Sequence, residues 1–474
     1  MNTEEFKKNG HRLIDWIAEY YDNLERLPVK SRVEPGKIFA SLPEHAPEAP
    51  EAFDTIMQDF EKHLFKGITH WQHPSFFAYF NANSSAYSIL GELLTAAIGA
   101  QGMIWETSPA AAEVEEKMCD WMKRACGLPA DWQGVIQDTA STATLCALLM
   151  AREQHSNFMI NKFGFHAGSK YIVYCSTEAH SSIEKDVKIA GFGSNQLRKI
   201  RADSRFAMMP DVLNKQIVDD LNEGLIPLCV ISAVGTTGSH GIDPIREVAG
   251  ICAKYHLFHH VDAAHAGNAT LLPEHRHIID GLELADSYVF NPHKWMFTNF
   301  DCSLFYIKDK ATLIKTFEIL PEYLKTGMED QVNNYRDWGI QLGRRFRALK
   351  LWFVLRGFGL DGIRSKFRLH IHLAGTLAKK LQDDKRFELL APVPLNLVCF
   401  RYLPTKQMDL EEVNERNKSL EQMINNTGRA YITHTKLLGK YTLRVCIGQT
   451  DVEQRHVDDF WRLLIEQTNL LENE

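Results

Sequence analysis

The sequence lacks the features that mark several common classes of protein. Its nine cysteines lie far apart, include no CxxC pair and are odd in number, which indicates reduced thiols in a cytoplasm. No apolar run approaches the roughly 20 residues of a membrane span, and the N-terminus has no apolar signal segment. The net charge of −7 argues against a basic nucleic-acid surface. We therefore expect a cytoplasmic protein that binds neither membrane nor nucleic acid.

The phosphate-binding motifs of the common nucleotide sites are also absent. The sequence has neither a GxxxxGK run nor a GxGxxG run after a predicted strand, so a nucleotide is not favoured. Hydrophobic residues make up 45% and charged residues 24%, as in ordinary globular proteins. The length suffices for about three folding units, or for one large domain with appendages.

The chain begins with an arm of predicted helices. Apolar residues recur with a helical period over residues 3–24, and a second helix is expected at 52–65. Residues 42–51 between them contain three prolines and no periodicity, which predicts an extended connector. We assign residues 1–84 to this arm, which should pack on the rest of the chain or on a partner subunit.

Strands and helices alternate in the middle region, residues 85–375. Such alternation predicts an α/β fold with a mostly parallel sheet, covered on both faces, whose ligands bind at the carboxyl ends of the strands. A long helix is expected at 341–357, ended by Gly357, and a smaller α+β domain at 376–474. The predicted strands of the middle region are 134–137, 170–175, 228–233, 257–261, 288–290 and 303–307.

Lys294 stands directly after a predicted buried strand, in the segment FNPHKW. Lysines are rarely buried unless they are paired or functional. Burial lowers the pKa of the amine until it can act as a nucleophile toward a carbonyl carbon. The alternative is an ordinary surface lysine at a strand end, and this segment alone does not decide between the two.

Asp262 ends another apolar strand and is followed by two alanines. A carboxylate in this place can hold a pyridinium nitrogen in its charged form, and small neighbours let a flat ring lie against the backbone. The alternative is an aspartate that caps the next helix. A metal site is not expected from the nearby histidines, because His259 and His260 are consecutive strand residues and point to opposite faces.

Three further segments follow predicted strands. Small and hydroxylated residues at 138–144 open a helix, where free backbone N–H groups bind anions. His180 lies between a strand and a helix, where it could stack on a flat ring and titrate near neutral pH. Thr237 belongs to a turn of small residues suited to an oxygen-rich ligand. Taken alone, the first two segments are more often a plain helix start and a loop histidine.

In combination, these segments resemble the pyridoxal-phosphate-dependent group II amino-acid decarboxylases, and among them most closely the aromatic-L-amino-acid decarboxylases. The shared order is an anion site, a histidine, a threonine turn, a strand-end aspartate and a lysine. The resemblance covers nearly the whole chain. Matching stretches are His70-Trp71, Pro74 to Phe80 as PSFFAYF, Ser108 to Ala110, Asn291 to Trp295, Asn299 to Ser303 as NFDCS, and Leu342 to Phe346 as LGRRF.

The resemblance implies the aspartate-aminotransferase-like fold (fold type I) and pyridoxal 5'-phosphate as the cofactor. Lys294 would bind it as a Schiff base, Asp262 would pair with its ring nitrogen, and His180 would stack on the ring and orient the substrate carboxylate. Tyr335, in a polar segment at 325–337 that we expect to be a mobile loop, would protonate the intermediate. The other implied cofactor contacts are Thr139, Ala140, Ser141, Asn291 and His293 around the phosphate, Thr237 beside the ring and phosphate, and Ala264 under the ring.

The resemblance also implies substrate contacts, which would involve both subunits of a homodimer with shared active sites. The family often carries Pro-Thr after the AYF run, where this chain has Asn81-Ala82-Asn83, and an aromatic residue where it has His265. A pocket more polar than usual is therefore expected. The implied substrate contacts are Trp71, Tyr79, Phe80, His180 and, reaching into the neighbouring pocket, Gln101 and Met103.

The implied activity is the decarboxylation of an aromatic L-amino acid to its amine and CO₂, and the sequence does not identify the amino acid. An aldehyde-forming oxidative decarboxylase is the first alternative, although members of that kind tend to lack the loop tyrosine. A decarboxylase of an acidic amino acid such as glutamate would need a fixed cation near the side chain, and residues 73–83 offer none. A non-catalytic homologue is disfavoured by the complete set of Lys294, Asp262 and His180.

Overall fold

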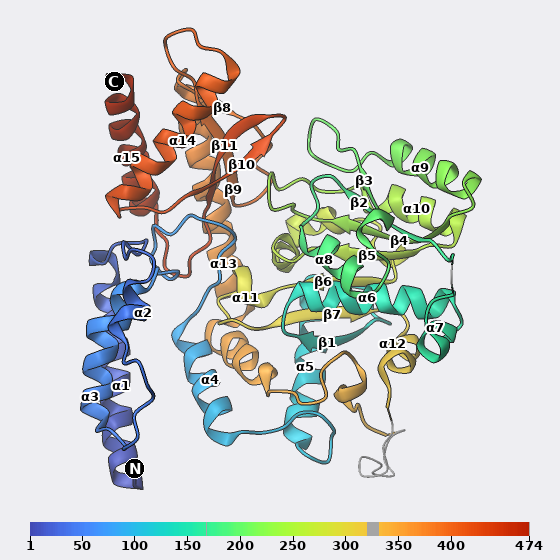
Figure 1. The fold of residues 1–474 in the computed structure, drawn as a ribbon, viewed down its shortest axis with the longest axis horizontal. Helices are drawn as coiled ribbons and strands as arrows, with labels where there is room; N and C mark the ends of the chain where they lie inside the picture. Colours follow the sequence, from blue (N-terminus) through green and yellow to red (C-terminus); the bar gives the residue numbers. More distant parts are fainter. Residues whose placement is uncertain (167, 320–330, 474) are drawn as a thin grey trace.

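A seven-stranded sheet forms the centre of the large lobe (Figure 1). The computed structural model describes residues 1–166, 168–319 and 331–473. The strands are β1 (Gln133–Gln137), β2 (Tyr171–Ser176), β3 (Leu197–Ile200), β4 (Ile226–Ala233), β5 (Phe258–Asp262), β6 (Ser287–Phe290) and β7 (Ser303–Ile307). Their order is β1-β7-β6-β5-β4-β2-β3, and only the two pairings made by β7 are antiparallel.

Helices cover both faces of this sheet. Ile172 and Val230 pack with α9 and α10 on one face, whereas Val173 and Ile231 pack with α6 on the other. Burial on both faces explains why the strands are apolar along their whole length instead of alternating. The α-helices within the described part of residues 85–346 are α4 (Ala86–Ile98), α5 (Pro109–Cys126), α6 (Ala140–His155), α7 (Met159–Phe163), α8 (Ser182–Ile189), α9 (Pro210–Asn222), α10 (Ile245–Tyr255), α11 (Pro292–Trp295) and α12 (Lys310–Phe317).

A second, antiparallel sheet forms the C-terminal lobe. Its strands are β8 (Phe387–Leu389), β9 (Leu397–Tyr402), β10 (Thr433–Leu437) and β11 (Lys440–Cys446), in the order β10-β11-β9-β8. It packs with α13 (Arg347–Asp383), α14 (Leu410–Thr427) and α15 (Gln454–Glu472). Phe77 inserts into the same core, and its carbonyl accepts a hydrogen bond from the N–H of Cys446, so the last part of the N-terminal arm is anchored in this lobe.

The N-terminal arm lies along one edge of the molecule (Figure 1). It contains α1 (Thr3–Asn23), α2 (Lys37–Ser41) and α3 (Phe53–Asp59). Trp16 of α1 contacts the rings of Phe60 and Phe65, and Arg12 pairs with Asp54. No residue of α1 is buried, so one face of this amphipathic helix has no cover within the described part of the chain.

The predicted fold class and most predicted strands are confirmed. Strand β3 was not predicted. The prediction of a helix at 341–357 ended by Gly357 is wrong, because α13 begins at Arg347 and continues past Gly357 to a break at Gly359, whose φ of 63° is left-handed. All nine cysteines are free and buried. Within the described residues, no helix combines the length and apolar character needed to cross a membrane.

Candidate active site

The segments that follow the strands of the large sheet converge on one cavity of about 240 Å³. Neighbouring parallel strands end at the same edge of the sheet, so residues far apart in the sequence meet there. All ten residues predicted to contact the cofactor line the cavity: Thr139, Ala140, Ser141, His180, Thr237, Asp262, Ala264, Asn291, His293 and Lys294.

Lys294 lies on the four-residue helix α11, directly after β6. Desolvation lowers the pKa of its amine, while the negative charge of Asp262 partly opposes that shift. The Nζ atom lies 5.4 Å from the centre of the Phe80 ring, which also lines the cavity. A lysine with a lowered pKa carries more neutral amine at a given pH, which is the form that attacks a carbonyl carbon.

Asp262 and His180 are the other two polar side chains of the cavity for which we predicted a catalytic role. Asp262 accepts a hydrogen bond from the Ala264 N–H at 3.0 Å, which orients its carboxylate at the end of β5. The Nδ1 atom of His180 accepts a hydrogen bond from the Ser182 N–H at 3.2 Å, so a neutral ring carries its proton on Nε2. Burial and the charge of Lys294 lower the pKa of His180, which favours this neutral donor form.

The N-terminus of α6 forms the anion-binding end of the cavity. Thr139 is the N-cap and accepts a hydrogen bond from the Thr142 N–H, while Ala140 and Ser141 begin a helix of 16 residues. Free N–H groups and the helix dipole favour an anion at this position. Burial lowers the pKa of the nearby His293 to about 3, and its Nδ1 accepts a hydrogen bond from the Cys302 N–H. This imidazole is therefore neutral and does not add charge to the anion site.

The donor set fits a phosphorylated pyridine aldehyde. An amine lies in the same cavity as a carboxylate suited to a pyridinium nitrogen and as a helix N-terminus suited to a phosphate. Alanine at 264 leaves room for a flat ring beside Asp262. The residues present therefore satisfy the recognition needs of all three polar parts of that cofactor.

The predicted aromatic substrate contacts are only partly at this cavity. Phe80 lines it, whereas Trp71 and Tyr79 do not. Their two rings stack on each other with centres 5.6 Å apart, and both remain partly exposed. The Phe80 ring stacks on His265 with centres 4.0 Å apart, and His265 also stacks on Trp295 at 5.1 Å. The imidazole of His265 thus packs between two aromatic rings, in the place where the family often has an aromatic residue.

Gln101, Met103 and Tyr335 lie together, but not at the cavity of their own chain. The Arg344 N–H donates to the side-chain oxygen of Gln101 at 3.1 Å, and the Arg336 N–H donates to the carbonyl of Met103 at 2.8 Å. These bonds join the segment of Gln101 and Met103 to the segment that contains Tyr335, Arg336 and Arg344.

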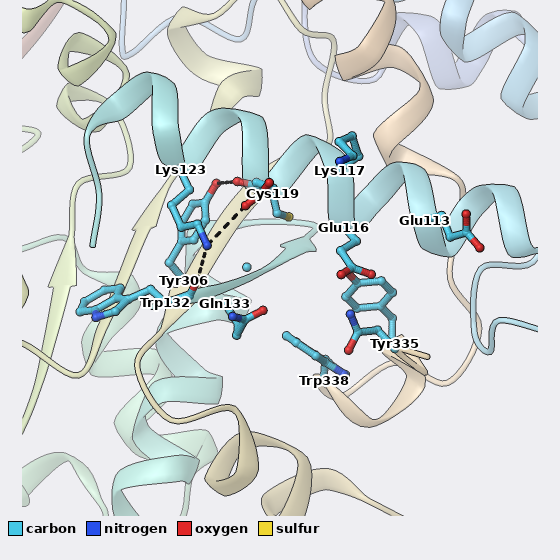
Figure 2. A pocket seen from close by; sticks show the side chains of 13 residues that line it. Glu113, Glu116, Lys117, Cys119, Lys123, Trp132, Gln133, Tyr306, Tyr335 and Trp338 are labelled. Atoms are coloured by element: carbon cyan, nitrogen blue, oxygen red, sulfur yellow. Dashed lines mark hydrogen bonds and ion pairs between the residues drawn. The ribbon is translucent and has the colours of Figure 1, made fainter. Parts of the chain in front are cut away.

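Tyr335 is buried, with 1% of its surface exposed. Figure 2 shows it beside Trp338 in a separate pocket of about 440 Å³, which is also lined by residues of α5 such as Glu116. The predicted mobile loop at 325–337 was expected to bury little, and this is wrong for Tyr335, whose ring packs in the core of the large lobe. The mobility of the segment stays a prediction. Residues 325–330 of that predicted loop lie outside the described residues.

Asn81 and Asn83 also differ from the prediction of a polar substrate pocket. Both are buried, and neither lines the cavity. Asn83 donates hydrogen bonds to two backbone carbonyls, and the side-chain oxygen of Asn81 accepts a weak one from the Cys446 thiol. The cavity is also lined by residues that were not predicted one by one: Ser182, Ala233, Gly235, Thr236 and Phe300. Gly235 and Thr236 belong to the predicted turn that contains Thr237, and Phe300 belongs to the NFDCS stretch.

Comparison with known proteins places this geometry in context. The family model described as "Pyridoxal-dependent decarboxylase conserved domain" matches residues 35–403. The chain is 41% identical to tryptophan decarboxylase 2 of Oryza sativa subsp. japonica, over 98% of this chain and 94% of that protein. It is 40% identical to a phenylacetaldehyde synthase of a Rosa hybrid cultivar, over 98% and 94%. Its fold matches the crystal structure of Oryza sativa TDC with PLP and tryptamine at a TM-score of 0.97, with 33% identity and coverage of 100% and 99%.

Proposed function

Because the chain belongs to the pyridoxal-dependent decarboxylase family, we propose that it converts an aromatic L-amino acid to the corresponding amine and CO₂. The observation that carries this proposal is the meeting of Lys294, Asp262 and His180 in one cavity at the strand ends. The relatives described above support an aromatic substrate, since they include a tryptophan decarboxylase and a phenylacetaldehyde synthase.

The cofactor is pyridoxal 5'-phosphate, as the family and the PLP-containing structure of a relative indicate. When bound, it supplies an electron sink for the electron pair left by the departing CO₂. In our proposal Lys294 binds it covalently through Nζ, and Asp262 pairs with its ring nitrogen. Its phosphate would be held at the start of α6 by Thr139, Ala140, Ser141, Asn291 and His293, with Thr237 beside the ring and phosphate and Ala264 under the ring.

The protein's own groups then perform three tasks. The Asp262 carboxylate keeps a proton on the ring nitrogen, because its negative charge favours the charged form of its partner. The Nε2–H of His180 donates to the substrate carboxylate and fixes its direction. The amine of Lys294, with its lowered pKa, is neutral often enough to exchange with the amine of the substrate.

Protonation of the substrate carbon remains a prediction for Tyr335. Its burial outside the cavity means that it could serve this role only after its segment moved, or at the cavity of a second copy of the chain. The aldehyde-forming alternative therefore stays open, because Tyr335 was the residue on which we based the distinction. The acidic-substrate alternative gains no support, since no arginine is among the described residues that line the cavity.

A homodimer with shared active sites is part of the proposal. The uncovered face of α1 continues into an apolar groove against α4, with Ile14, Ile17 and Leu90 among its lining residues. Gln101 and Met103 lie outside their own cavity, which is what residues serving a neighbouring subunit would show. We also propose a cytoplasmic location, supported by the nine free thiols, and domains at 1–84, 85–375 and 376–474.

The test is a panel of free aromatic and acidic amino acids incubated with the purified protein and pyridoxal 5'-phosphate. We expect CO₂ and the amine in equal amounts from at least one aromatic amino acid. Aldehyde with hydrogen peroxide in place of the amine would establish the alternative activity. Lys294→Ala should abolish turnover and the absorbance of the lysine-bound cofactor. Full activity in this variant, or turnover of glutamate alone, would overturn the proposal.

A further inference from the structure

Asn83 joins the backbone around Lys294 to the C-terminal lobe. Its Nδ2 donates one hydrogen bond to the carbonyl of Lys294 at 2.9 Å and another to the carbonyl of Gly448 at 2.6 Å. Its backbone N–H donates to the carbonyl of His293 at 3.2 Å. Asn83 thus donates hydrogen bonds to two consecutive carbonyls of α11 and to one carbonyl just after β11.

The helix α11 needs such outside donors. It contains only four residues, and the last carbonyls of a helix have no partner inside it. Those of His293 and Lys294 are in this position, and the side chain and N–H of Asn83 supply what the helix cannot. The backbone that carries the reactive lysine therefore depends on a residue 211 positions away in the sequence.

The contact is also closely packed. Asn83 is 1% exposed, and its side-chain oxygen has no hydrogen-bond partner among the described residues. Burying an amide with an unpaired oxygen is unfavourable, so its two N–H bonds must account for its presence. Gly448, whose carbonyl accepts from Asn83, is closely packed as well, because a Cβ at this position would overlap the side-chain oxygen of Asn81.

We propose that Asn83 is a positioning residue for Lys294: it fixes the lysine backbone against the C-terminal lobe and so sets where Nζ enters the cavity. The inference rests on the proposed role of Lys294 as the residue that binds the cofactor. It assigns Asn83 to the support of the lysine and not to contact with the substrate. A serine at this position is too short to bridge both carbonyls.

Asn417 provides a matched control. It is equally buried, and its Nδ2 also bridges two backbone carbonyls, those of Tyr402 at 2.9 Å and Val413 at 2.8 Å. It lies on α14 in the C-terminal lobe and does not line the cavity. Asn83→Ser and Asn417→Ser therefore remove the same kind of bridge, one at Lys294 and one elsewhere.

The test measures how fast the cofactor-free protein captures pyridoxal 5'-phosphate, followed by the absorbance of the lysine-bound form. It also measures the pH midpoint of that absorbance and the Tm of each variant. We expect both substitutions to lower the Tm. Only Asn83→Ser should slow capture, by roughly ten- to a hundredfold, because a small misplacement of a reacting group has effects of that size. It should also move the pH midpoint.

The proposal would be overturned if the Asn83 variant captured the cofactor at a rate within about twofold of that of the Asn417 variant, with a pH midpoint within roughly a few tenths of a unit. Such equal values would mean that the Asn83 bridge acts on stability alone. If Asn83→Ser does not fold, Asn83→Asp keeps the shape while removing both donors, and the same outcomes apply. If the unmodified protein captures the cofactor normally but converts no aromatic amino acid, the proposed function is contradicted. The comparison of the Asn83 and Asn417 variants would still decide the role of Asn83.

Discussion

Asp262 ends β5 and Lys294 follows the adjacent strand β6, so the two side chains enter one cavity from neighbouring strand ends. Burial lowers the pKa of the Lys294 amine, and the charge of Asp262 opposes that shift. The same carboxylate raises the pKa of His180 against the effect of burial. Asp262 therefore influences both of the other polar groups proposed to act on the substrate.

Asp262→Asn tests this influence. The amide has the same shape but no charge, so it no longer favours a protonated ring nitrogen on the cofactor. We expect kcat to fall at least about a hundredfold, a typical contribution from a group that controls a proton. The far-ultraviolet circular dichroism should stay the same, since the Ala264 N–H can still donate to the amide oxygen. A variant as fast as the unmodified enzyme would remove Asp262 from the mechanism.

Gly448→Ala tests the close contact between the lobes. The added Cβ would overlap the side-chain oxygen of Asn81 and lie 3.1 Å from the Nδ2 of Asn396. Overpacking of a buried site costs about 1–3 kcal/mol, and chemical denaturation should show that loss. Gly250→Ala is the control, because this glycine is exposed on α10 with nothing within 4 Å of the added Cβ. The control should be neutral or slightly stabilising, by up to about 1 kcal/mol. Equal stabilities for the two variants would contradict the packing.

The stability of the fold should fall as the solution becomes acidic. Burial lowers the pKa of five histidines to about 3: His240, His259, His260, His293 and His370. In the unfolded chain a histidine binds its proton near pH 6.5, so unfolding takes up protons below that pH and becomes easier. Burial raises the pKa of Asp186 and Asp243 to about 7, which has the opposite effect between about pH 7 and 4.

Among these seven groups the five histidines outweigh the two aspartates, so together they contribute an uptake of about three protons on unfolding near pH 5. Their contribution to the slope is about 4 kcal/mol per pH unit, with stability decreasing from pH 6.5 downward. Denaturation of the cofactor-free protein at pH 7, 6 and 5 measures it without interference from cofactor binding. A free energy of unfolding that is constant or rises over this range would contradict the buried, neutral histidines.

Much of the site followed from the sequence because of the sheet. Lys294, Asp262 and His180 each follow a strand, and parallel strands bring their carboxyl ends to one edge whatever the length of chain between them. Asn83 could not be placed in this way, because its partners lie 211 and 365 positions away and involve backbone carbonyls, which have no sequence signature. Its departure from the family pattern predicted a more polar pocket, whereas in the structure Asn83 is buried and bonds to backbone carbonyls.

The position of Tyr335 shows the same limit. Its polar neighbours in the sequence predicted a mobile loop that buries little. Local composition does not show which distant segment covers a residue, so the burial of Tyr335 could not be predicted. The segment around residues 101–105 lies against it, joined by the Arg336 N–H to the Met103 carbonyl and by the Trp105 N–H to the Asn334 side chain. Burial of this kind depends on tertiary contacts and not on local periodicity.

The last prediction concerns which phenol supplies the proton to the substrate carbon. Between Ile307, the end of β7, and the start of α13 the chain has two tyrosines, Tyr335 and Tyr323. Tyr335 is 1% exposed and away from the cavity, and burial raises its pKa well above the usual value. It is therefore a phenol that keeps its proton, and it would reach a substrate after its segment moved or at the cavity of a second copy of the chain. Tyr323 is outside the described residues and serves as the control because of its place in the sequence alone.

We expect Tyr335→Phe still to release CO₂ but to lose amine, with aldehyde and hydrogen peroxide formed in the presence of oxygen. Its Tm should change only slightly, because the ring and its packing on Trp338 remain. Tyr323→Phe is the control and should leave the ratio of amine to CO₂ near one. The measurement is the yield of CO₂, amine, aldehyde and peroxide for each variant on the best substrate of the panel. Normal amine from the Tyr335 variant together with loss of amine from the Tyr323 variant would make Tyr323 the donor and contradict the prediction. Normal amine from both variants would mean that neither phenol protonates the substrate. The proton would then have to come from another group at the cavity, and His180 and Lys294 are the candidates within the described residues.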